Sequence, residues 1–291
     1  MSDVRIRPMT VDDVPAAERV TAVGFHELDT RMFRRAWPEP QLRPAERGAM
    51  WAERTRHLVS HDPGGCWVAE RDDQLLGVVV SFVREQLWLL ASYAVLPDAQ
   101  GLGLGKALLA PALEHGRGCL RGMLNASSDP RALRRYHDAG FTLHPQMFLR
   151  GTPDRAAIPV LENVREGGEG DLDLMNSVDR QIRGSAHGPD HEILMRQLRL
   201  VVSETRSAQG YAYLDQGVAL LAATDRRTAT SLLWEAIASA ESELMVGHVT
   251  PENSWAVDVG LAARLELHQE GFLALRNMRP PAPYLAHGAL M

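Results

Sequence analysis

The residues best suited to chemistry lie in the stretch 93–110, YAVLPDAQGLGLGKALLA. Gln100, Gly103 and Gly105 form a Q-x-x-G-x-G pattern, and Lys106 follows directly. Glycine has no Cβ, so the backbone can turn sharply and bring its N–H groups close to a ligand. A helix that begins here leaves its first N–H groups unpaired and turns the positive end of its dipole outward. The pattern therefore predicts a site for a phosphate or pyrophosphate group.

The flanking residues exclude two common nucleotide loops. A Walker loop needs Ser or Thr directly after its Lys to bind magnesium, whereas Lys106 is followed by Ala107. A Rossmann fingerprint places its glycines straight after the strand and an acidic residue about 20 positions on. Here a turn at Pro97 separates the predicted strand from the glycines, and positions 120–125 offer no acidic residue. Neither nucleotide loop fits this stretch.

The stretch closely resembles the acyl-CoA loop of the GNAT superfamily of N-acyltransferases. In that family V-x-P-x-x-Q/R-x-x-G-x-G/A joins the fourth strand to the third helix, and Val95, Pro97, Gln100 and Gly103 match it. The resemblance implies that backbone amides hold the pyrophosphate of CoA, and that the strand faces the pantetheine and the thioester. The implied acetyl-CoA contacts are Tyr93, Ala94, Val95, Gln100, Gly101, Leu102, Gly103, Leu104, Gly105 and Lys106. A glycine turn without a ligand is the alternative interpretation.

A second match lies further along the chain. Ala132, Tyr136, Gly140 and Phe141 form A-x-x-x-Y-x-x-x-G-F. In the GNAT family this Tyr lies beside the sulfur of CoA, so the resemblance implies that Tyr136 is the general acid that protonates the leaving thiolate. A phenol with a pKa of about 10 is protonated at neutral pH and is a fair match to a thiolate. The alternative is a Tyr that packs a helix onto the sheet.

The sequence departs from the family pattern at two positions. Asp129 stands where the family usually has an Asn that contacts the pantetheine, and we keep it as a cofactor-binding candidate. Leu124 stands where some members carry a Glu base, so no general base is identified. Glu85 and His137 are weak candidates, and a neutral amine or a relaying water needs neither. The arginines of the Tyr136 helix either reach a CoA phosphate or form a solvated face; they are Arg131, Arg134 and Arg135.

Composition narrows the classes of function. The 291 residues carry a net charge of −6 and are 45% hydrophobic, which indicates a packed protein without a basic surface for nucleic acid. No apolar run approaches the ~20 residues of a membrane span, and the N-terminus lacks a signal-peptide core. We therefore expect a cytoplasmic protein that binds neither membranes nor nucleic acid. Cys66 and Cys119 are too few for a disulfide framework or a zinc site, so no metal is expected.

Hydrophobic periodicity supplies the elements that hold these residues. Short strands are expected at 66–70, 75–83 and 87–95, followed by a helix from 103 to about 115. A strand at 122–126, a helix at 130–140 and a strand at 142–150 complete the set. The resemblance implies an α/β (α+β) fold in which a mixed, mostly antiparallel central sheet is flanked by helices.

The second half resembles a repeat of this plan, so we expect tandem GNAT folds. The predicted domains are 1–152, which binds acetyl-CoA and is catalytic, and 160–291, which is degenerate. The glycine loop is replaced by the stretch 222–227, AATDRR, with Asp225 where phosphate would bind. Gly271-Phe272 is matched to the Gly-Phe pair after Tyr136, which puts Leu267 in the place of the Tyr.

A polar cluster in the second half allows two interpretations. Arg183, His187, Asp190 and His191 lie close together in sequence. Arg183 would bind an acidic acceptor group and His187 would act as a base, or the residues form a capped helix start. Their spacing matches no recognised metal site.

The sequence thus predicts an N-acetyltransferase that moves the acetyl group of acetyl-CoA directly to the amine of a small-molecule acceptor within a ternary complex. A monomer or homodimer is expected. The alternatives are a non-catalytic acyl-CoA-binding or regulatory module, and a protein N-terminal or lysine acetyltransferase. An enzyme should hydrolyse acetyl-CoA slowly without an acceptor and faster with one, whereas a sensor should only bind it.

Overall fold

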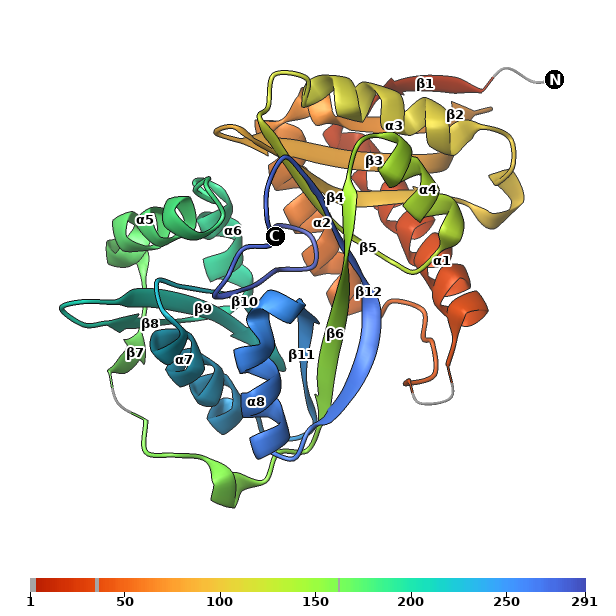
Figure 1. Cartoon of the computed structure of the whole chain (residues 1–291). Helices are drawn as coiled ribbons and strands as arrows, with labels where there is room; N and C mark the ends of the chain where they lie inside the picture. The colour runs from red at the N-terminus through yellow and green to blue at the C-terminus, as the bar shows by residue number, and fades with distance from the viewer. Residues whose placement is uncertain (1–3, 35–36, 162) are drawn as a thin grey trace. The chain divides into compact units, whose positions relative to one another are not determined.

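The computed structural model describes residues 4–34, 37–161 and 163–291 (Figure 1). These residues form two compact units. The first unit holds the chain up to Gly122 together with Asp129–Arg135, and the second holds Met123–Ser128 and Tyr136–Met291. Each unit combines a largely antiparallel sheet with helices, which confirms the predicted fold class.

The sheet of the first unit follows the chain in the order β1–β2–β3–β4, and every pair is antiparallel. Asp72 and Asp73 have φ angles of 51° and 61°, the conformation of a tight hairpin turn. β4 bulges at Ala91, where its pairing with β3 shifts by one residue. The strands are β1 (Arg5–Pro8), β2 (Cys66–Arg71), β3 (Gln74–Arg84) and β4 (Leu87–Val95).

Helices α1 (Val14–Met32), α2 (Ala45–His61) and α3 (Leu104–His115) pack on this sheet. A Cβ on Gly24 of α1 would lie 3.3 Å from the Cβ of Ala94, so Ala94 faces α1. A Cβ on Gly77 of β3 would lie 2.7 Å from Leu108 of α3, and Gly77 pairs with Val95. Since successive strand residues point to opposite faces, α1 and α3 cover opposite faces of the sheet.

The second unit has a longer sheet, in the order β5–β12–β6–β11–β10–β9–β8–β7. β10 and β11 run parallel, whereas β6 is antiparallel to both β11 and β12. The strands are β5 (Arg121–Ala126), β6 (Thr142–Gly151), β7 (Val164–Glu166), β8 (Arg199–Glu204), β9 (Gln209–Asp215), β10 (Gly217–Ala223), β11 (Leu244–Val249), β12 (Glu266–Arg276) and β13 (Tyr284–Leu285). The remaining helices are α4 (Pro130–Asp138), α5 (Leu172–Ile182), α6 (Asp190–Gln197), α7 (Arg226–Ser239) and α8 (Ser254–Ala262).

Strand β9 presents different chemistry to its two faces. Ala212 and Leu214 are buried in an apolar core with Leu232 of α7. Tyr211 and Tyr213 alternate with them and hydrogen-bond to side chains of α5 and α6. The period of two along the strand thus separates an apolar core from a buried polar cluster.

The order of elements repeats along the chain. The first set is β1, α1, α2, β2, β3, β4, α3, β5, α4, β6, and the second is β7, α5, α6, β8, β9, β10, α7, β11, α8, β12. Arg7 makes two hydrogen bonds to the carboxylate of Asp13, and Arg165 makes the same pair to Asp171, again six residues on. The same local interaction therefore opens both sets.

The predicted match of Gly271-Phe272 to the end of the Tyr136 helix is wrong. Both residues lie within β12, as does Leu267, and α8 already ends at Ala262. A Cβ on Gly271 would lie 1.9 Å from the carbonyl oxygen of Ala126. This glycine is therefore required by a close approach of two strands and does not mark a helix end.

Hydrogen bonds identify the true counterpart of Tyr136. The N–H of Phe141 donates to the carbonyl of Tyr136 at 3.0 Å, and the N–H of Leu265 donates to that of Gly260 at 2.9 Å, with the same spacing. Gly260 thus takes the place of the Tyr in the second set. A Cβ there would lie 2.7 Å from Leu149, so packing leaves no room for a side chain.

The two compact units do not coincide with the two repeated sets of elements. β6 belongs to the first set of elements but pairs with β11 and β12 of the second unit. The predicted domain boundaries at 152 and 160 stay a prediction about the repeat.

No helix in the described ranges is long and apolar enough to cross a membrane. α1, with 19 residues, carries charged side chains along its length, among them Glu18, Glu27 and Arg31.

The Arg7–Asp13 pair predicts an acid-sensitive contribution to stability. Its hydrogen bonds lower the pKa of Asp13 from 3.8 to about 2, and the Asp13 side chain is only 12% exposed. The contribution is therefore complete above the unfolded pKa and is lost as pH falls through about 2. Asp13→Asn should lower the free energy of unfolding by about 1–2 kcal/mol at neutral pH, and by progressively less toward low pH.

Urea denaturation at several pH values measures this difference. Asp12→Asn is the control, because Asp12 is an exposed neighbour and its substitution should change stability by less than about 0.5 kcal/mol. Equal effects of the two substitutions at neutral pH would contradict the assigned role of Asp13.

Candidate functional site

The glycine loop joins β4 to α3 through two left-handed residues. Gly101 has a φ angle of 83° and Gly103 of 82°, a region that other residues rarely adopt. Nothing lies within 4 Å of where a Cβ would stand on either residue. The two glycines are therefore required by backbone conformation, and the space around them is open. The side-chain amide of Gln100 donates to the carbonyl of Val95 at 3.2 Å, which ties the loop to the end of β4.

The first turn of α3 begins without a side-chain cap. Gly103 occupies the N-cap position, and the N–H of Ala107 donates to its carbonyl at 3.1 Å. The preceding amides, at positions 104–106, have no acceptor within the helix. Gly101, Leu102, Gly103 and Lys106 are exposed, whereas Leu104 and Gly105 are buried. Leu104 thus anchors the helix by packing while its amide stays at the open end.

Gly105 is enclosed by two side chains. A Cβ there would lie 2.5 Å from the hydroxyl of Tyr93 and 2.8 Å from Nη1 of Arg135. These two groups contact one another, since Arg135 Nη1 donates to the Tyr93 hydroxyl at 3.2 Å. Burial raises the pKa of Tyr93 although the charge of Arg135 opposes this. The guanidinium therefore lies beside the positive end of the α3 dipole, an arrangement that attracts an anion.

The predicted residues of β4 point in different directions. Ala94 faces α1, whereas Tyr93 and Val95 face α3, as the alternation of a strand requires. Only the Tyr93 side chain reaches the glycine loop. Ala94 and Val95 can line a ligand through their backbone, and their side chains pack the two layers.

Asp129 serves as a helix cap. Its Oδ1 accepts from the N–H of Arg131 at 2.8 Å, and its Oδ2 accepts from Arg31 at 2.9 Å. Burial opposes ionisation, but the hydrogen bonds from Arg131 and Arg31 outweigh it and lower the pKa of Asp129. Its observed contacts are those of a structural residue.

Tyr136 is buried on α4 and directly follows Arg135, which contacts the loop. The weak candidates for a general base are poorly placed for catalysis: Glu85 lies in the turn before β4, at the opposite end of that strand from the loop, and His137 is exposed. The sequence alone did not distinguish Arg135 from the other arginines of this helix. Its position next to Tyr136, on a helix that follows the loop, is the sequence feature that could have singled it out.

In the second unit, the helix end that corresponds to the start of α3 is capped by a side chain. Asp225 is the N-cap of α7, and its carboxylate accepts from the N–H of Thr228 at 2.8 Å. β10 pairs with β11 only at Gly217 and Val218, and further along it pairs with β13 through Leu221. The helix end that would bind an anion thus binds a carboxylate of the chain, and β13 lies beside β10.

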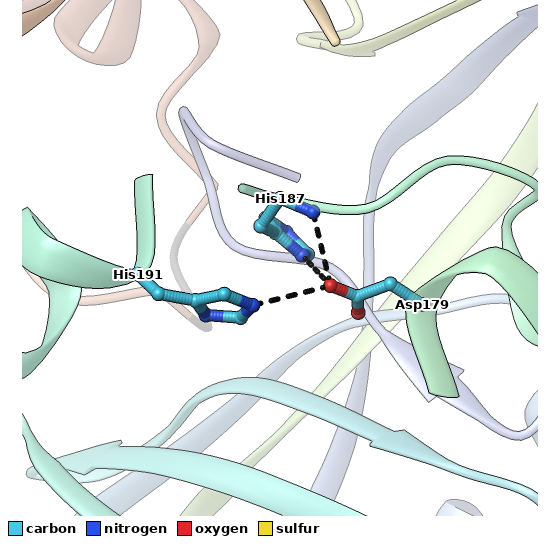
Figure 2. Close-up of side chains that lie close together, drawn as sticks. All are labelled: Asp179, His187 and His191. Carbon is cyan, nitrogen blue, oxygen red and sulfur yellow. Dashed lines mark hydrogen bonds and ion pairs between the residues drawn. The ribbon is translucent and has the colours of Figure 1, made fainter. Parts of the chain in front are cut away.

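A buried polar cluster lies on the other face of β9 (Figure 2). Asp179 of α5 accepts through Oδ2 from Nδ1 of His187 at 2.7 Å, and Nε2 of His191 lies 3.3 Å from the same oxygen. Burial and the charge of Arg183 lower the pKa of His187 to about 4, so its imidazole is neutral at pH 7. The sequence had placed Arg183, His187 and His191 together, whereas Asp179 was missed because it lies on the preceding helix.

Comparison with known proteins assigns part of the chain to a family. A profile of the Acetyltransferase (GNAT) family matches residues 23–141, which include the glycine loop and Tyr136. The matched stretch is a GNAT acetyltransferase domain and makes up less than half of the 291 residues. The chain is also similar to mycothiol acetyltransferases: 39% identical over 88 residues to that of Streptomyces coelicolor, and 40% identical over 96 residues to that of Thermomonospora curvata. These matches cover 28% and 32% of this chain, and the same shares of the two relatives' lengths.

Solved structures show a likeness in fold over nearly the whole chain. A candidate acetyltransferase from Pyrococcus horikoshii superposes with a TM-score of 0.76 and 19% identity, covering 99% of this chain and 95% of that one. A GCN5-related N-acetyltransferase from Kribbella flavida gives a TM-score of 0.60 and 17% identity, covering 94% of this chain and 71% of that one. At these identities the likeness shows the fold alone.

The left-handed φ of Gly103 predicts that its substitution by Ala is more destabilising than the same substitution at Gly118. Gly103→Ala forces a Cβ into a φ of 82° and should destabilise the protein by about 1–2 kcal/mol, although no atom is close. Gly118 is the matched control, because it also has open space but no left-handed φ. Gly118→Ala should change stability by less than about 0.5 kcal/mol in chemical denaturation. Equal costs would mean that the loop relaxes to a different conformation.

Proposed function

We propose that this protein is an acetyl-CoA-dependent N-acetyltransferase whose acceptor is a small-molecule amine. The observation that carries the proposal is the uncapped start of α3, where the amides of residues 104–106 and the guanidinium of Arg135 converge beside an open glycine loop. A pyrophosphate there gains charge-assisted hydrogen bonds from oriented donors. The GNAT family of residues 23–141 supports acetyl transfer as the reaction.

Different residues of the glycine loop and its neighbours contact different parts of acetyl-CoA in this proposal. The amides of residues 101–106 hold the pyrophosphate, and Gln100 holds the loop against β4. Lys106 and Arg135 supply positive charge, and the backbone of residues 93–95 aligns the pantetheine. A backbone N–H of β4 directed at the thioester oxygen stabilises the negative charge that develops there.

Transfer then proceeds directly between the two bound substrates. The acceptor nitrogen attacks the thioester carbon, the carbon–sulfur bond breaks, and the amine loses a proton to solvent. Tyr136 donates its phenolic proton to the leaving thiolate and is reprotonated from solvent. Binding of a neutral amine removes the need for a carboxylate base, which is consistent with Leu124 at the position where some relatives carry Glu.

The proposed acceptor class rests on similarity and on the second unit. The related proteins named mycothiol acetyltransferases support a small-molecule acceptor. The second unit fills its own anion site with Asp225, so we assign it no donor binding and treat it as the degenerate copy of a tandem pair. The enzyme should hydrolyse acetyl-CoA slowly alone and faster with its amine acceptor, and an acceptor screen of small amines tests this directly.

Arg135 should contribute to the affinity for acetyl-CoA. Arg135→Gln removes the charge beside the α3 terminus and should raise the Kd about tenfold, by loss of one charge-assisted interaction. Arg134→Gln is the matched control, because Arg134 is an exposed neighbour on the same helix. Isothermal titration at low and high salt measures both, and the difference should shrink as salt screens the charge. Identical affinities of the two variants would remove Arg135 from the site.

Tyr136 should act on the chemical step. Tyr136→Phe should lower kcat about 10²- to 10⁴-fold at saturating acceptor, while the Kd for acetyl-CoA changes little. Titration with acetyl-CoA serves as the control that the variant still folds and binds. An unchanged kcat would contradict the assignment of Tyr136 as general acid, while binding without any turnover by the wild type would favour an acyl-CoA sensor.

A further inference from the structure

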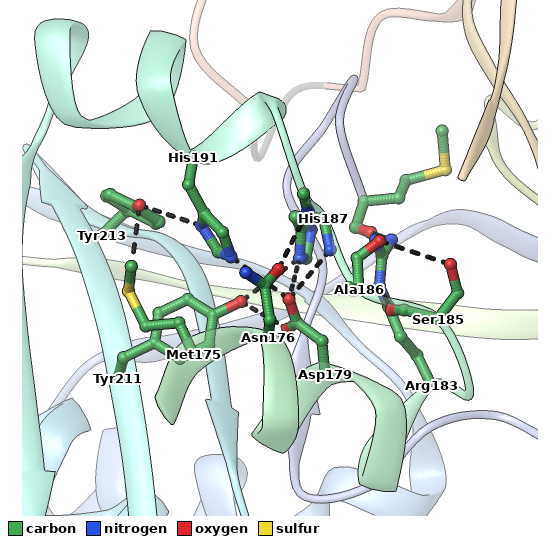
Figure 3. Close-up of polar contacts among 12 residues, drawn as sticks. Met175, Asn176, Asp179, Arg183, Ser185, Ala186, His187, His191, Tyr211 and Tyr213 are labelled. Atoms are coloured by element: carbon green, nitrogen blue, oxygen red, sulfur yellow. Dashed lines mark hydrogen bonds and ion pairs between the residues drawn. The ribbon is translucent and has the colours of Figure 1, made fainter. Parts of the chain in front are cut away.

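The buried polar cluster of the second unit consists of Asp179, His187, His191, Tyr211 and Tyr213 (Figure 3). Both histidines and Asp179 have no exposed surface. One nitrogen of each imidazole and one carboxylate oxygen of Asp179 lie within 4.8 Å of one another. Divalent transition metals prefer such nitrogen and oxygen ligands. None of the three residues lies in the glycine loop proposed to bind acetyl-CoA.

His191 carries the argument for a ligand. Its Nδ1 lies 3.0 Å from the Tyr213 hydroxyl, and its Nε2 points at Oδ2 of Asp179 from 3.3 Å without a hydrogen-bond partner in the described chain. A separation of about 3.3 Å is the distance between adjacent ligands of a tetrahedral ion bound at about 2.0–2.1 Å. A lone pair on Nε2 facing a carboxylate oxygen is stabilised when a cation lies between them.

The partners around these donors resemble the support that metal ligands need. The Tyr213 hydroxyl donates to Sδ of Met175 at 4.0 Å, so its oxygen accepts from Nδ1–H of His191, and Nε2 then carries the lone pair that can bind a metal. The Tyr211 hydroxyl donates to Oδ1 of Asp179 at 2.5 Å, which turns Oδ2 toward the imidazoles. Such second contacts fix the tautomer and orientation of a ligand.

Arg183 is buried close to the cluster, and its positive charge acts on both Asp179 and His187. Nε of Arg183 donates to the carbonyl of Ser185 at 2.9 Å, and its Nη1 donates to the carbonyl of Met291. The carboxylate of Asp179 contacts both histidines.

We propose that Asp179, His187 and His191 bind a zinc-like divalent transition metal in the second unit. The ligands are Oδ2 of Asp179, Nδ1 of His187 and Nε2 of His191. The metal takes the place of the hydrogen between His187 and Asp179, whose 2.7 Å separation widens to about 3.3 Å when both bind the ion. The His187 proton moves to Nε2 of the same ring, so no net proton is released. The proposal departs from the expectation of no metal, which considered the histidines without Asp179, a residue that lies eight positions before His187 on another element.

Titration of the tag-free, chelator-treated protein with Co²⁺ tests the proposal. The wild type should bind one Co²⁺ per chain and show the visible absorption of protein-bound Co²⁺, and added Zn²⁺ should abolish that absorption by displacing the ion. His191→Gln and Asp179→Asn should each abolish the absorption. His248→Gln is the matched control and should retain it, because His248 lies 3.6 Å from Glu270 in a similar His–carboxylate pair of the same unit.

A third variant covers the case in which a ligand substitution prevents folding. Tyr213→Phe keeps every ligand but removes the partner of His191, and should weaken Co²⁺ binding about 10- to 100-fold. Absence of stoichiometric Co²⁺ binding by the folded wild type would overturn the proposal. Binding that survives in folded Asp179→Asn and His191→Gln, or that is lost equally in His248→Gln, would overturn it as well.

Discussion

The first unit depends on keeping one helix end open. α3 is held against the sheet by buried residues such as Leu104 and Leu108, yet its first amides must stay without partners. Three glycines meet this demand by different means. Gly101 and Gly103 supply the left-handed backbone, and Gly105 admits the side chains that lie against the first turn. An unpartnered helix end is unfavourable by itself, and its position beside an arginine is the observation that supports the proposed anion site.

The second set of elements has the same order but does not keep the helix end at α7, the counterpart of α3, uncapped. It keeps the Arg165–Asp171 pair at its start, with the same geometry as Arg7–Asp13 in the first set. It gives up the glycine loop, and Asp225 caps α7 with its own carboxylate. The ion pair at the start of each set thus recurs with the fold, whereas the glycine loop occurs in the first set, where we propose donor binding.

Sequence reasoning succeeded where the constraint is local and failed where it comes from the fold. The open loop and the start of its helix were predictable, because Gly103 and its neighbours encode backbone conformation directly. The prediction for Gly271 was wrong because this glycine is needed where the carbonyl of Ala126 in β5 approaches its backbone. No residue near Gly271 in the sequence indicates that contact. The side chains that β4 and α4 bring to Gly105, with Arg135 foremost, follow from the packing of distant segments. Asp179 joins the histidines only because α5 folds back over β9.

The central claim is that the α3 terminus recognises the pyrophosphate of the donor. Calorimetric titration of the wild type with acetyl-CoA and with S-acetylpantetheine, which shares the thioester but lacks the pyrophosphate, tests it most directly. Two lost charge-assisted hydrogen bonds predict that S-acetylpantetheine binds at least roughly 100-fold more weakly. Equal affinities for the two ligands, or no binding of acetyl-CoA at all, would contradict the account.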